Sequence, residues 1–270
     1  MMSWVNNRRS TRLDVRDRGL QYGDGVFETM RVHNGRVRLL AYHLERLEAG
    51  CRRLQIKVPS ARALRHELER RAALRREAVM KLIVTRGSGS RGYRPSGAER
   101  CTRILTLHPL PPSLGDAPVR VRLCATRLGE NPLLAGLKTL NRLESVLARS
   151  EWSDAAIWEG LMRDAGENIV CGTMSNVFLR RGAALLTPRL DRCGVAGVMR
   201  RWVLETAGDL QLRVREARLR WQDLSQAEEV FMCNAVVGIR SVAVIERGRL
   251  RLRARSFEAA NRLRARLDSL

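Results

Sequence analysis

The sequence predicts an α+β fold in two domains. Segments with the alternation of strands are mixed with segments at helical spacing, and several strands are joined as hairpins, which favours α+β over a doubly wound parallel sheet. A length of 270 residues suits one large domain or two smaller ones. The stretch from His108 to Pro118 holds four prolines, so we expect domains over residues 1–108 and 119–270 with a linker over residues 109–118.

In the first half, the pair Asn34-Gly35 lies between TMRVH and RVRLL and predicts a hairpin over residues 29–38, because Asn-Gly favours the tight turn of a hairpin. Apolar residues at helical spacing predict helices over residues 42–54 and 61–77. The runs AVMKLIVTR and TRILTLH are typical of strands.

The second half continues the mixture of strands and helices. Helices are expected over residues 136–150, 195–207 and 257–267. Strands and hairpins are expected over residues 119–127, 155–170, 176–188, 214–219, 228–237 and 241–251.

The chain carries a formal charge of +22, which raises the question of a nucleic-acid partner. Only three of its 50 basic residues are lysines (Lys57, Lys81 and Lys138), and the arginines are spread along the whole chain without a zinc finger, an RNA-binding signature or a basic zipper. This distribution argues against a nucleic-acid role and favours a small anionic substrate. It also leaves only three candidates for a lysine that carries a cofactor.

No apolar run approaches the roughly 18 residues of a membrane-spanning helix, and the N-terminus has no secretion signal. The six cysteines form no CxxC pair and no metal-ligand spacing with the four histidines. We therefore expect free thiols, a cytoplasmic location, and neither a membrane nor a metal as partner.

Six runs carry a resemblance to a known family. They are DRGLQYGDGVFET (17–29), HLERL (43–47), RGSGSRGYRP (86–95), RLGENPLLAGLKTLNRLE (127–144), GVAGVMR (194–200) and FMCNAV (231–236). Together they resemble the class-IV, or fold-type IV, pyridoxal-5′-phosphate (PLP) enzymes, and among these the aminodeoxychorismate lyases, from about residue 17 to residue 242.

The resemblance implies a small N-terminal α/β sandwich, a larger C-terminal domain with a mixed β-barrel-like core, and a homodimer. It implies PLP as cofactor and conversion of 4-amino-4-deoxychorismate to 4-aminobenzoate and pyruvate in folate biosynthesis. Two alternatives stay open, namely an aminotransferase acting on a D- or branched-chain amino acid, and a relative whose catalysis is altered or lost.

The resemblance also implies roles for individual residues. Lys138 is the expected Schiff-base lysine and general acid/base, and a position just inside a helix start among leucines would desolvate its amine and lower its pKa. Arg46 is expected to bind the cofactor phosphate, since a guanidinium meets phosphate oxygens in a bidentate way. The backbone near a helix start would complete the phosphate site. The remaining cofactor contacts are expected from Val198, Met199, Asn234 and Ala235, and the substrate contacts from Thr29, Arg91, Tyr93, Asn131 and Asn141.

One position departs from the family pattern. Where the family carries a glutamate shortly before a Ser-Asn-hydrophobic-Phe run, facing the pyridine nitrogen of the cofactor, this chain reads VCGTMSNVF and has Cys171. A neutral thiol would leave the ring a weaker electron sink. A transaminase would suffer most, whereas a lyase whose product becomes aromatic would suffer less.

Overall fold

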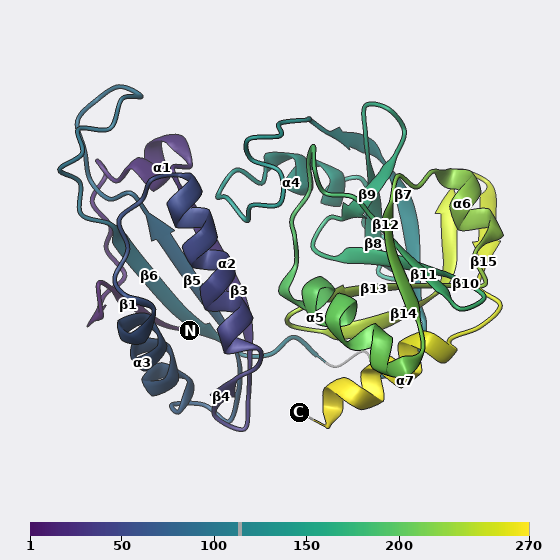
Figure 1. Ribbon diagram of the computed structural model, residues 1–270. Coiled ribbons are helices and arrows are strands. Elements are labelled where there is room, and N and C mark those ends of the chain that lie inside the picture. The colour runs from purple at the N-terminus through teal and green to yellow at the C-terminus, as the bar shows by residue number, and fades with distance from the viewer. Residues whose placement is uncertain (113–114, 270) are drawn as a thin grey trace. The chain divides into compact units, whose positions relative to one another are not determined.

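The computed structural model describes residues 1–112 and 115–269, and the contacts divide the chain into two compact units (Figure 1). The first unit comprises Met1–Pro112 and Leu137–Asn141, and the second comprises Ser113–Gly136 and Arg142–Leu270. The expected linker, residues 109–118, includes Ser113 and Leu114, which lie outside the described residues, so the domain boundaries stay predictions. No helix in the described part of the chain is long and apolar enough to cross a membrane.

The first unit is built on a six-stranded sheet in the order β2-β1-β6-β5-β3-β4. Within it, β3 and β5 pair antiparallel in register from Gly25 opposite Thr85 to His33 opposite Glu77. The strands are β1 (Met2–Val5), β2 (Arg8–Arg9), β3 (Gly25–His33), β4 (Arg36–Val37), β5 (Glu77–Thr85) and β6 (Thr102–His108).

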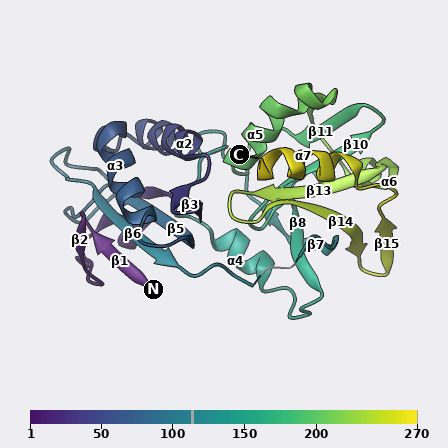
Figure 2. The same ribbon diagram turned by 90° about the horizontal axis from the view of Figure 1, so that it is seen from below.

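Helices α2 (Leu40–Arg53) and α3 (Ala61–Ala72) lie together on one side of this sheet (Figure 2). Alternate residues of β3, namely Val26, Met30 and Val32, are buried in one apolar core with Leu44 and Leu47 of α2. The intervening residues of β3 point to the other face, because side chains alternate along a strand. The third helix, α1 (Arg18–Tyr22), is capped by the Asp17 side chain at its start and by Gly23 at its end.

The hairpin predicted over residues 29–38 is confirmed and is formed by β3 and β4. Asn34 and Gly35 have φ angles of 49° and 76°, as a turn with two left-handed residues requires. The helix expected over residues 61–77 is too long, because α3 ends at Ala72 and β5 begins at Glu77.

The second unit contains a nine-stranded mixed sheet in the order β12-β11-β10-β13-β14-β7-β8-β9, with β15 paired to β14. The sheet curls, so that β9 also contacts β10, and this gives the barrel-like core that the resemblance implies. The strands are β7 (Val119–Leu128), β8 (Ile157–Asp164), β9 (Ile169–Gly172), β10 (Asn176–Arg181), β11 (Ala184–Pro188), β12 (Arg213–Ala217), β13 (Glu229–Asn234), β14 (Gly238–Arg247) and β15 (Leu250–Arg253).

The helices of the second unit are α4 (Leu143–Arg149), α5 (Val198–Thr206), α6 (Trp221–Gln226) and α7 (Glu258–Asp268), with a 3-10 turn over Ala207–Leu210. The buried carboxylate of Glu229 in β13 accepts hydrogen bonds from the backbone of Ala259 and Ala260 at 3.0 and 2.8 Å. A negative charge at a helix N-terminus satisfies its open N–H groups, so β13 fixes the start of α7.

One expectation about the centre of the chain is wrong. Residues 136–150 do not form one helix, because α4 starts only at Leu143 and the residues before it are extended. Gly136 has a φ of +80°, and the backbone that follows makes its hydrogen bonds to β3. Lys138 therefore lies on an extended segment and not just inside a helix.

Candidate active site

Lys138 is held against the first sheet by strand-like hydrogen bonds. Its carbonyl accepts from the N–H of Phe27 at 3.0 Å, and the N–H of Leu140 donates to the carbonyl of Gly25 at 3.1 Å. Thr139 is bridged to Val26. The segment Leu137–Asn141 thus pairs alongside the first residues of β3. This pairing fixes the backbone of the lysine on a rigid element.

The side chain of Lys138 packs on an aromatic ring. Its Nζ lies 4.2 Å from the centroid of the Phe27 ring, and the Nζ of Lys81 lies 5.1 Å from the same centroid. Lys81 is the Cα partner of Thr29 on the neighbouring strand. Two of the three lysines of the chain therefore gather at the start of β3, together with Thr29.

Behind the strand, Glu28 forms a buried cluster with two residues of α2. Its carboxylate is 2% exposed and accepts from Arg46 Nε at 2.8 Å, from Arg46 Nη2 at 2.5 Å and from His43 Nδ1 at 2.5 Å. His43 and Arg46 are one helical turn apart, so they present their polar ends to the same carboxylate. The Nε2 atom of His43 is buried and has no hydrogen-bond partner among the described residues.

The charges of this cluster follow from its surroundings. Burial alone would raise the pKa of Glu28, but the charge of Arg46 and the hydrogen bonds from Arg46 and His43 hold it at about 2. Burial lowers the pKa of His43, and the positive charges of Arg46 and Lys138 add to this, against the attraction of Glu28. The resting state is therefore a carboxylate, a guanidinium and a neutral imidazole.

Three predicted substrate residues lie in exposed parts of the first unit. Arg91 and Tyr93 belong to the loop between β5 and β6, and Tyr93 is 86% exposed. Asn141 ends the extended segment of Lys138, and its side chain lies so close to Gly23 that a Cβ there would come within 2.3 Å of Asn141 Oδ1. With a φ of +66°, Gly23 also lies in the left-handed region that favours glycine.

In the second unit, the run 194–200 forms the turn and first residues of α5. Gly197 is the N-cap, and no side chain in the described residues caps the helix. Asn176 holds the turn through a 2.9 Å hydrogen bond from its Nδ2 to the carbonyl of Val195, and a Cβ on Gly197 would come 2.1 Å from Asn176 Oδ1. The backbone amides of Val198 and Met199 thus begin a helix whose polar end has no side-chain cap, the arrangement that binds anions.

The other residues predicted in this unit lie in turns. Asn131 accepts the N–H of Leu133 at 3.1 Å and is exposed. Asn234, at the end of β13, accepts the N–H groups of Val236 and Val237 at 2.9 Å each, which shapes the turn that contains Ala235.

Cys171 lies in β9 and is buried. Burial raises the pKa of its thiol to about 12, and the neighbouring Cys193 and Glu159 act in the same direction, against Arg142. The thiol is therefore neutral near pH 7. It is not a substitute for a carboxylate.

Glu159 of β8 is a buried residue that the motifs did not indicate. Its carboxylate accepts hydrogen bonds from Gly160, Thr173, Met174 and Ser175. It thereby shapes the turn that directly follows Cys171 and Gly172. The sequence signal was a lone acidic residue within an otherwise apolar strand, IWEGLM.

Glu28 was also missed as a candidate site residue, and Lys81 was named only as one of three candidates for the cofactor lysine. Both lie in strands where alternation alone decides which face they occupy, and the sequence does not show which neighbours they meet there. The signal available for Glu28 was its place within the run DRGLQYGDGVFET. Glu167, the acidic residue four positions before Cys171, pairs with Arg163 and Arg127 at the turn after β8, and its side chain is 44% exposed.

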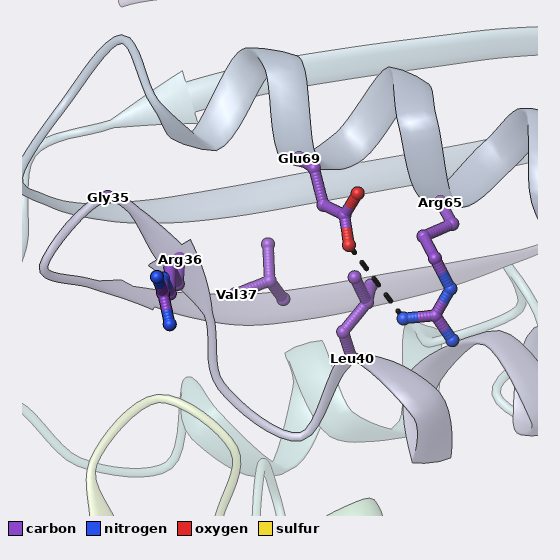
Figure 3. A pocket seen from close by; sticks show the side chains of 6 residues that line it. All are labelled: Gly35, Arg36, Val37, Leu40, Arg65 and Glu69. Atoms are coloured by element: carbon purple, nitrogen blue, oxygen red, sulfur yellow. Dashed lines mark ion pairs between the residues drawn. The ribbon is translucent and has the colours of Figure 1, made fainter.

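A separate hollow of 440 Å³ lies at the other end of the first sheet (Figure 3). Arg65 and Glu69 of α3 form an ion pair there at 3.8 Å. Its lining consists of Gly35, Arg36, Val37, Leu40, Arg65 and Glu69, none of which was predicted for the active site.

The chain is similar to known proteins over most of its length. The family model of the class IV aminotransferases matches residues 25–245. The chain is 36% identical to an aminodeoxychorismate lyase of Vibrio harveyi over 248 residues, covering 90% of this chain and 91% of that protein. It is 31% identical to a putative branched-chain-amino-acid aminotransferase of Methanocaldococcus jannaschii, covering 89% and 85%.

Solved structures give the same result. A crystal structure of 4-amino-4-deoxychorismate lyase from Pseudomonas aeruginosa is 46% identical and matches with a TM-score of 0.93, over 99% of this chain and 98% of that chain. The branched-chain aminotransferase of Escherichia coli matches with a TM-score of 0.86 at 22% identity, over 100% and 94%, and so supports the fold alone. The expected fold is confirmed, and the chain belongs to the class IV aminotransferase family.

Proposed function

We propose that the protein is a PLP-dependent lyase that converts 4-amino-4-deoxychorismate to 4-aminobenzoate and pyruvate. The observation that carries the proposal is the position of Lys138 at the edge of β3, with its amine on the Phe27 ring and a second lysine at the same ring. The lyases of Vibrio harveyi and Pseudomonas aeruginosa, similar over nearly the whole chain, support the same reaction.

Each unit by itself carries groups of the kind that PLP needs, namely a primary amine for its aldehyde and cationic or N–H donors for its phosphate. The first unit has Lys138 and Arg46, and the second has the start of α5, which lacks a side-chain cap. In this proposal the guanidinium of Arg46, which also pairs with Glu28, is the cation for the phosphate. In this proposal Val198, Met199, Asn234 and Ala235 contribute the remaining cofactor contacts.

When bound, PLP supplies an electron sink that makes the proton at C4 of the substrate acidic. Lys138 Nζ takes that proton as a positioned base. The C3–O bond then breaks, enolpyruvate leaves, and the ring of 4-aminobenzoate becomes aromatic. Lys138 returns the proton to the methylene carbon of the enolpyruvate, which gives pyruvate, so the atoms balance without water.

The substrate carries two carboxylates, and the proposal assigns cations to them. Lys81 and Arg91 are the candidates, because Lys81 lies beside Thr29 at the Phe27 ring and Arg91 lies in an exposed loop. Thr29, Tyr93, Asn131 and Asn141 are the proposed polar contacts. The positive charge of the whole chain also favours a dianionic substrate.

Cys171 bears on the choice of reaction. A thiol with a pKa of about 12 holds its proton and carries no negative charge, so it gives no electrostatic support to a proton on the pyridine nitrogen. Loss of that support weakens the electron sink. A lyase tolerates this better than an aminotransferase, because formation of an aromatic product drives the elimination. The neutral thiol therefore favours the lyase over an aminotransferase.

A homodimer and a cytoplasmic location complete the proposal. The cysteines found free are Cys51, Cys101, Cys124, Cys171, Cys193 and Cys233, as a reducing compartment would keep them. Sedimentation at several protein concentrations tests the dimer.

The lysine assignment can be tested without turnover. Protein loaded with PLP is treated with borohydride, and the position of the stable cofactor adduct is located by mass spectrometry. We expect the adduct on Lys138, none in Lys138→Ala, and an unchanged adduct on Lys138 in the control Lys57→Ala. An adduct on Lys81 would contradict the assignment.

The aminotransferase alternative predicts a different requirement. It needs a keto acid as amino acceptor, whereas the lyase needs none. If product forms only when a keto acid is added, the lyase proposal is wrong and the aminotransferase alternative holds.

A further inference from the structure

The loop that carries Arg91 and Tyr93 is fixed through its backbone by a buried arginine. Arg18, which is 3% exposed, donates from Nη1 to the carbonyl of Gly92 and from Nη2 to the carbonyl of Tyr93, both at 2.8 Å. A guanidinium presents these donors as a planar fork, so it holds two successive carbonyls in a defined orientation.

Tyr22 holds the same stretch from a second direction. Its hydroxyl accepts the N–H of Gly92 at 3.1 Å. Its ring lies 4.7 Å from the guanidinium of Arg18 and 5.5 Å from the ring of Tyr93. Gly92 is thus bound through both its N–H and its carbonyl.

Arg18 is itself held in place. Its Nε donates to Asp24 Oδ2 at 3.0 Å, and its backbone N–H donates to the carbonyl of Gly87 at 2.9 Å. Asp24 is fixed in turn by Arg86, whose Nε and Nη2 donate to it at 2.7 and 3.1 Å. Because these ion pairs fix the guanidinium of the buried Arg18, the loop is held by a network of side chains and not by one mobile side chain.

This network of side chains is linked to the segment that carries Lys138. Asp24 directly precedes Gly25, whose carbonyl accepts from Leu140, and Gly23 abuts the side chain of Asn141. The run DRGLQYGDG therefore joins the loop of Arg91 to the strand edge that holds the lysine, all within the first unit.

We propose that Arg18, together with Tyr22, is a positioning residue that fixes the Arg91–Tyr93 loop for recognition of a carboxylate of the substrate. The proposal rests on the lyase function proposed above. Only backbone atoms of Gly92 and Tyr93 are used by Arg18, so the side chains of Arg91 and Tyr93 stay exposed for a ligand. Neither Arg18 nor Tyr22 needs to touch the substrate.

The test uses the PLP-loaded full chain and two conservative variants. Arg18→Lys keeps the positive charge but loses the fork, and Tyr22→Phe removes only the hydroxyl that binds Gly92. The matched control is Arg16→Gln, since Arg16 is a nearby arginine whose side chain is 72% exposed and pairs with Asp14. Circular dichroism first establishes that each variant is folded.

The first readout is the rate of tryptic cleavage after Arg91, which mass spectrometry distinguishes from other sites; Arg94 precedes Pro95 and is not cut. Hydrogen bonds to a charged donor are among the stronger ones, so we expect about tenfold faster cleavage in Arg18→Lys. Tyr22→Phe is expected to give a smaller increase, and Arg16→Gln none. The second readout is the KM for aminodeoxychorismate, expected to rise in both variants while kcat stays within about twofold.

Each result decides the proposal. Cleavage rates in both variants equal to that of the parent overturn the fixation of the loop. Faster cleavage with an unchanged KM overturns the role in recognition. If the parent has no lyase activity, the proposed function fails, and the cleavage rate alone then decides whether Arg18 fixes the loop.

Discussion

Glu159→Gln tests how strongly one buried carboxylate organises the turn after Cys171. Glu159 is fully buried and accepts five hydrogen bonds. Oε1 receives the N–H of Gly160 at 2.9 Å and the N–H and hydroxyl of Thr173 at 3.2 and 2.5 Å. Oε2 receives the N–H of Met174 at 3.1 Å and the hydroxyl of Ser175 at 2.7 Å.

A glutamine of the same shape has only one acceptor oxygen. Its NH2 group is tolerated best at the position of Oε2, where the hydroxyl of Ser175 can turn to accept, but the N–H of Met174 then loses its acceptor. An orphaned buried donor costs about 1–3 kcal/mol, and loss of charge from the remaining bonds adds roughly 1 kcal/mol. We therefore expect a loss of about 3 kcal/mol, which lowers the Tm by roughly 6–12 °C.

Thermal unfolding followed by circular dichroism measures this loss. The matched control is Glu228→Gln, because Glu228 is 40% exposed and its ion pair with Arg180 contributes at most about 1 kcal/mol. Equal Tm values for Glu159→Gln and Glu228→Gln would refute the reasoning that Glu159 holds the turn.

Three further predictions concern the buried cluster of the first unit, Cys171 and the last helix. In the folded chain the pKa of His43 lies below 6.5 and that of Glu28 below 4.5, so the unfolded chain binds more protons and the free energy of unfolding decreases as the pH is lowered, first below about 6.5 through His43 and then from 4.5 towards 2 through Glu28. Urea unfolding at pH 7.5 and 5.5 measures the change in this free energy between the two pH values. The same change in His43→Gln as in the parent would contradict the role of His43. Cys171→Glu should raise the kcat of the lyase while Cys171→Ser does not, since only a carboxylate supports a proton on the ring nitrogen. Equal kcat values in the two folded, PLP-loaded variants would contradict the inference that the neutral thiol weakens the electron sink. Glu229→Gln should expose α7 to faster hydrogen exchange, because Glu229 caps its first N–H groups; unchanged exchange in that helix would show that the cap is dispensable.

Local patterns explain why most of the fold was predictable. Asn34-Gly35 permits little except a tight turn, and the hairpin over residues 29–38 formed there. The helix of HLERL and the strand TRILTLH also follow from spacing alone, and the structure has both, as α2 and β6. Such elements depend on residues close together in the chain.

The geometry around Lys138 was not predictable in this way. Its leucine-rich flanks have helical spacing, but its carbonyl bonds to Phe27, more than a hundred residues earlier in the chain, and this long-range pairing makes the segment extended. The role of Arg18 was hidden for the same reason, because its partners in the Arg91 loop lie 74 and 75 residues further along. The motifs indicated which residues matter, whereas the contacts that hold them come from tertiary structure.

The central claim is a lyase that depends on Lys138, and one assay addresses it most directly. Purified protein, PLP and freshly prepared aminodeoxychorismate are mixed without a keto acid, and 4-aminobenzoate and pyruvate are followed together. The account predicts equal release of both products, abolished in Lys138→Ala and retained in Lys57→Ala. No release from PLP-loaded protein, or equal release from Lys138→Ala, would contradict it.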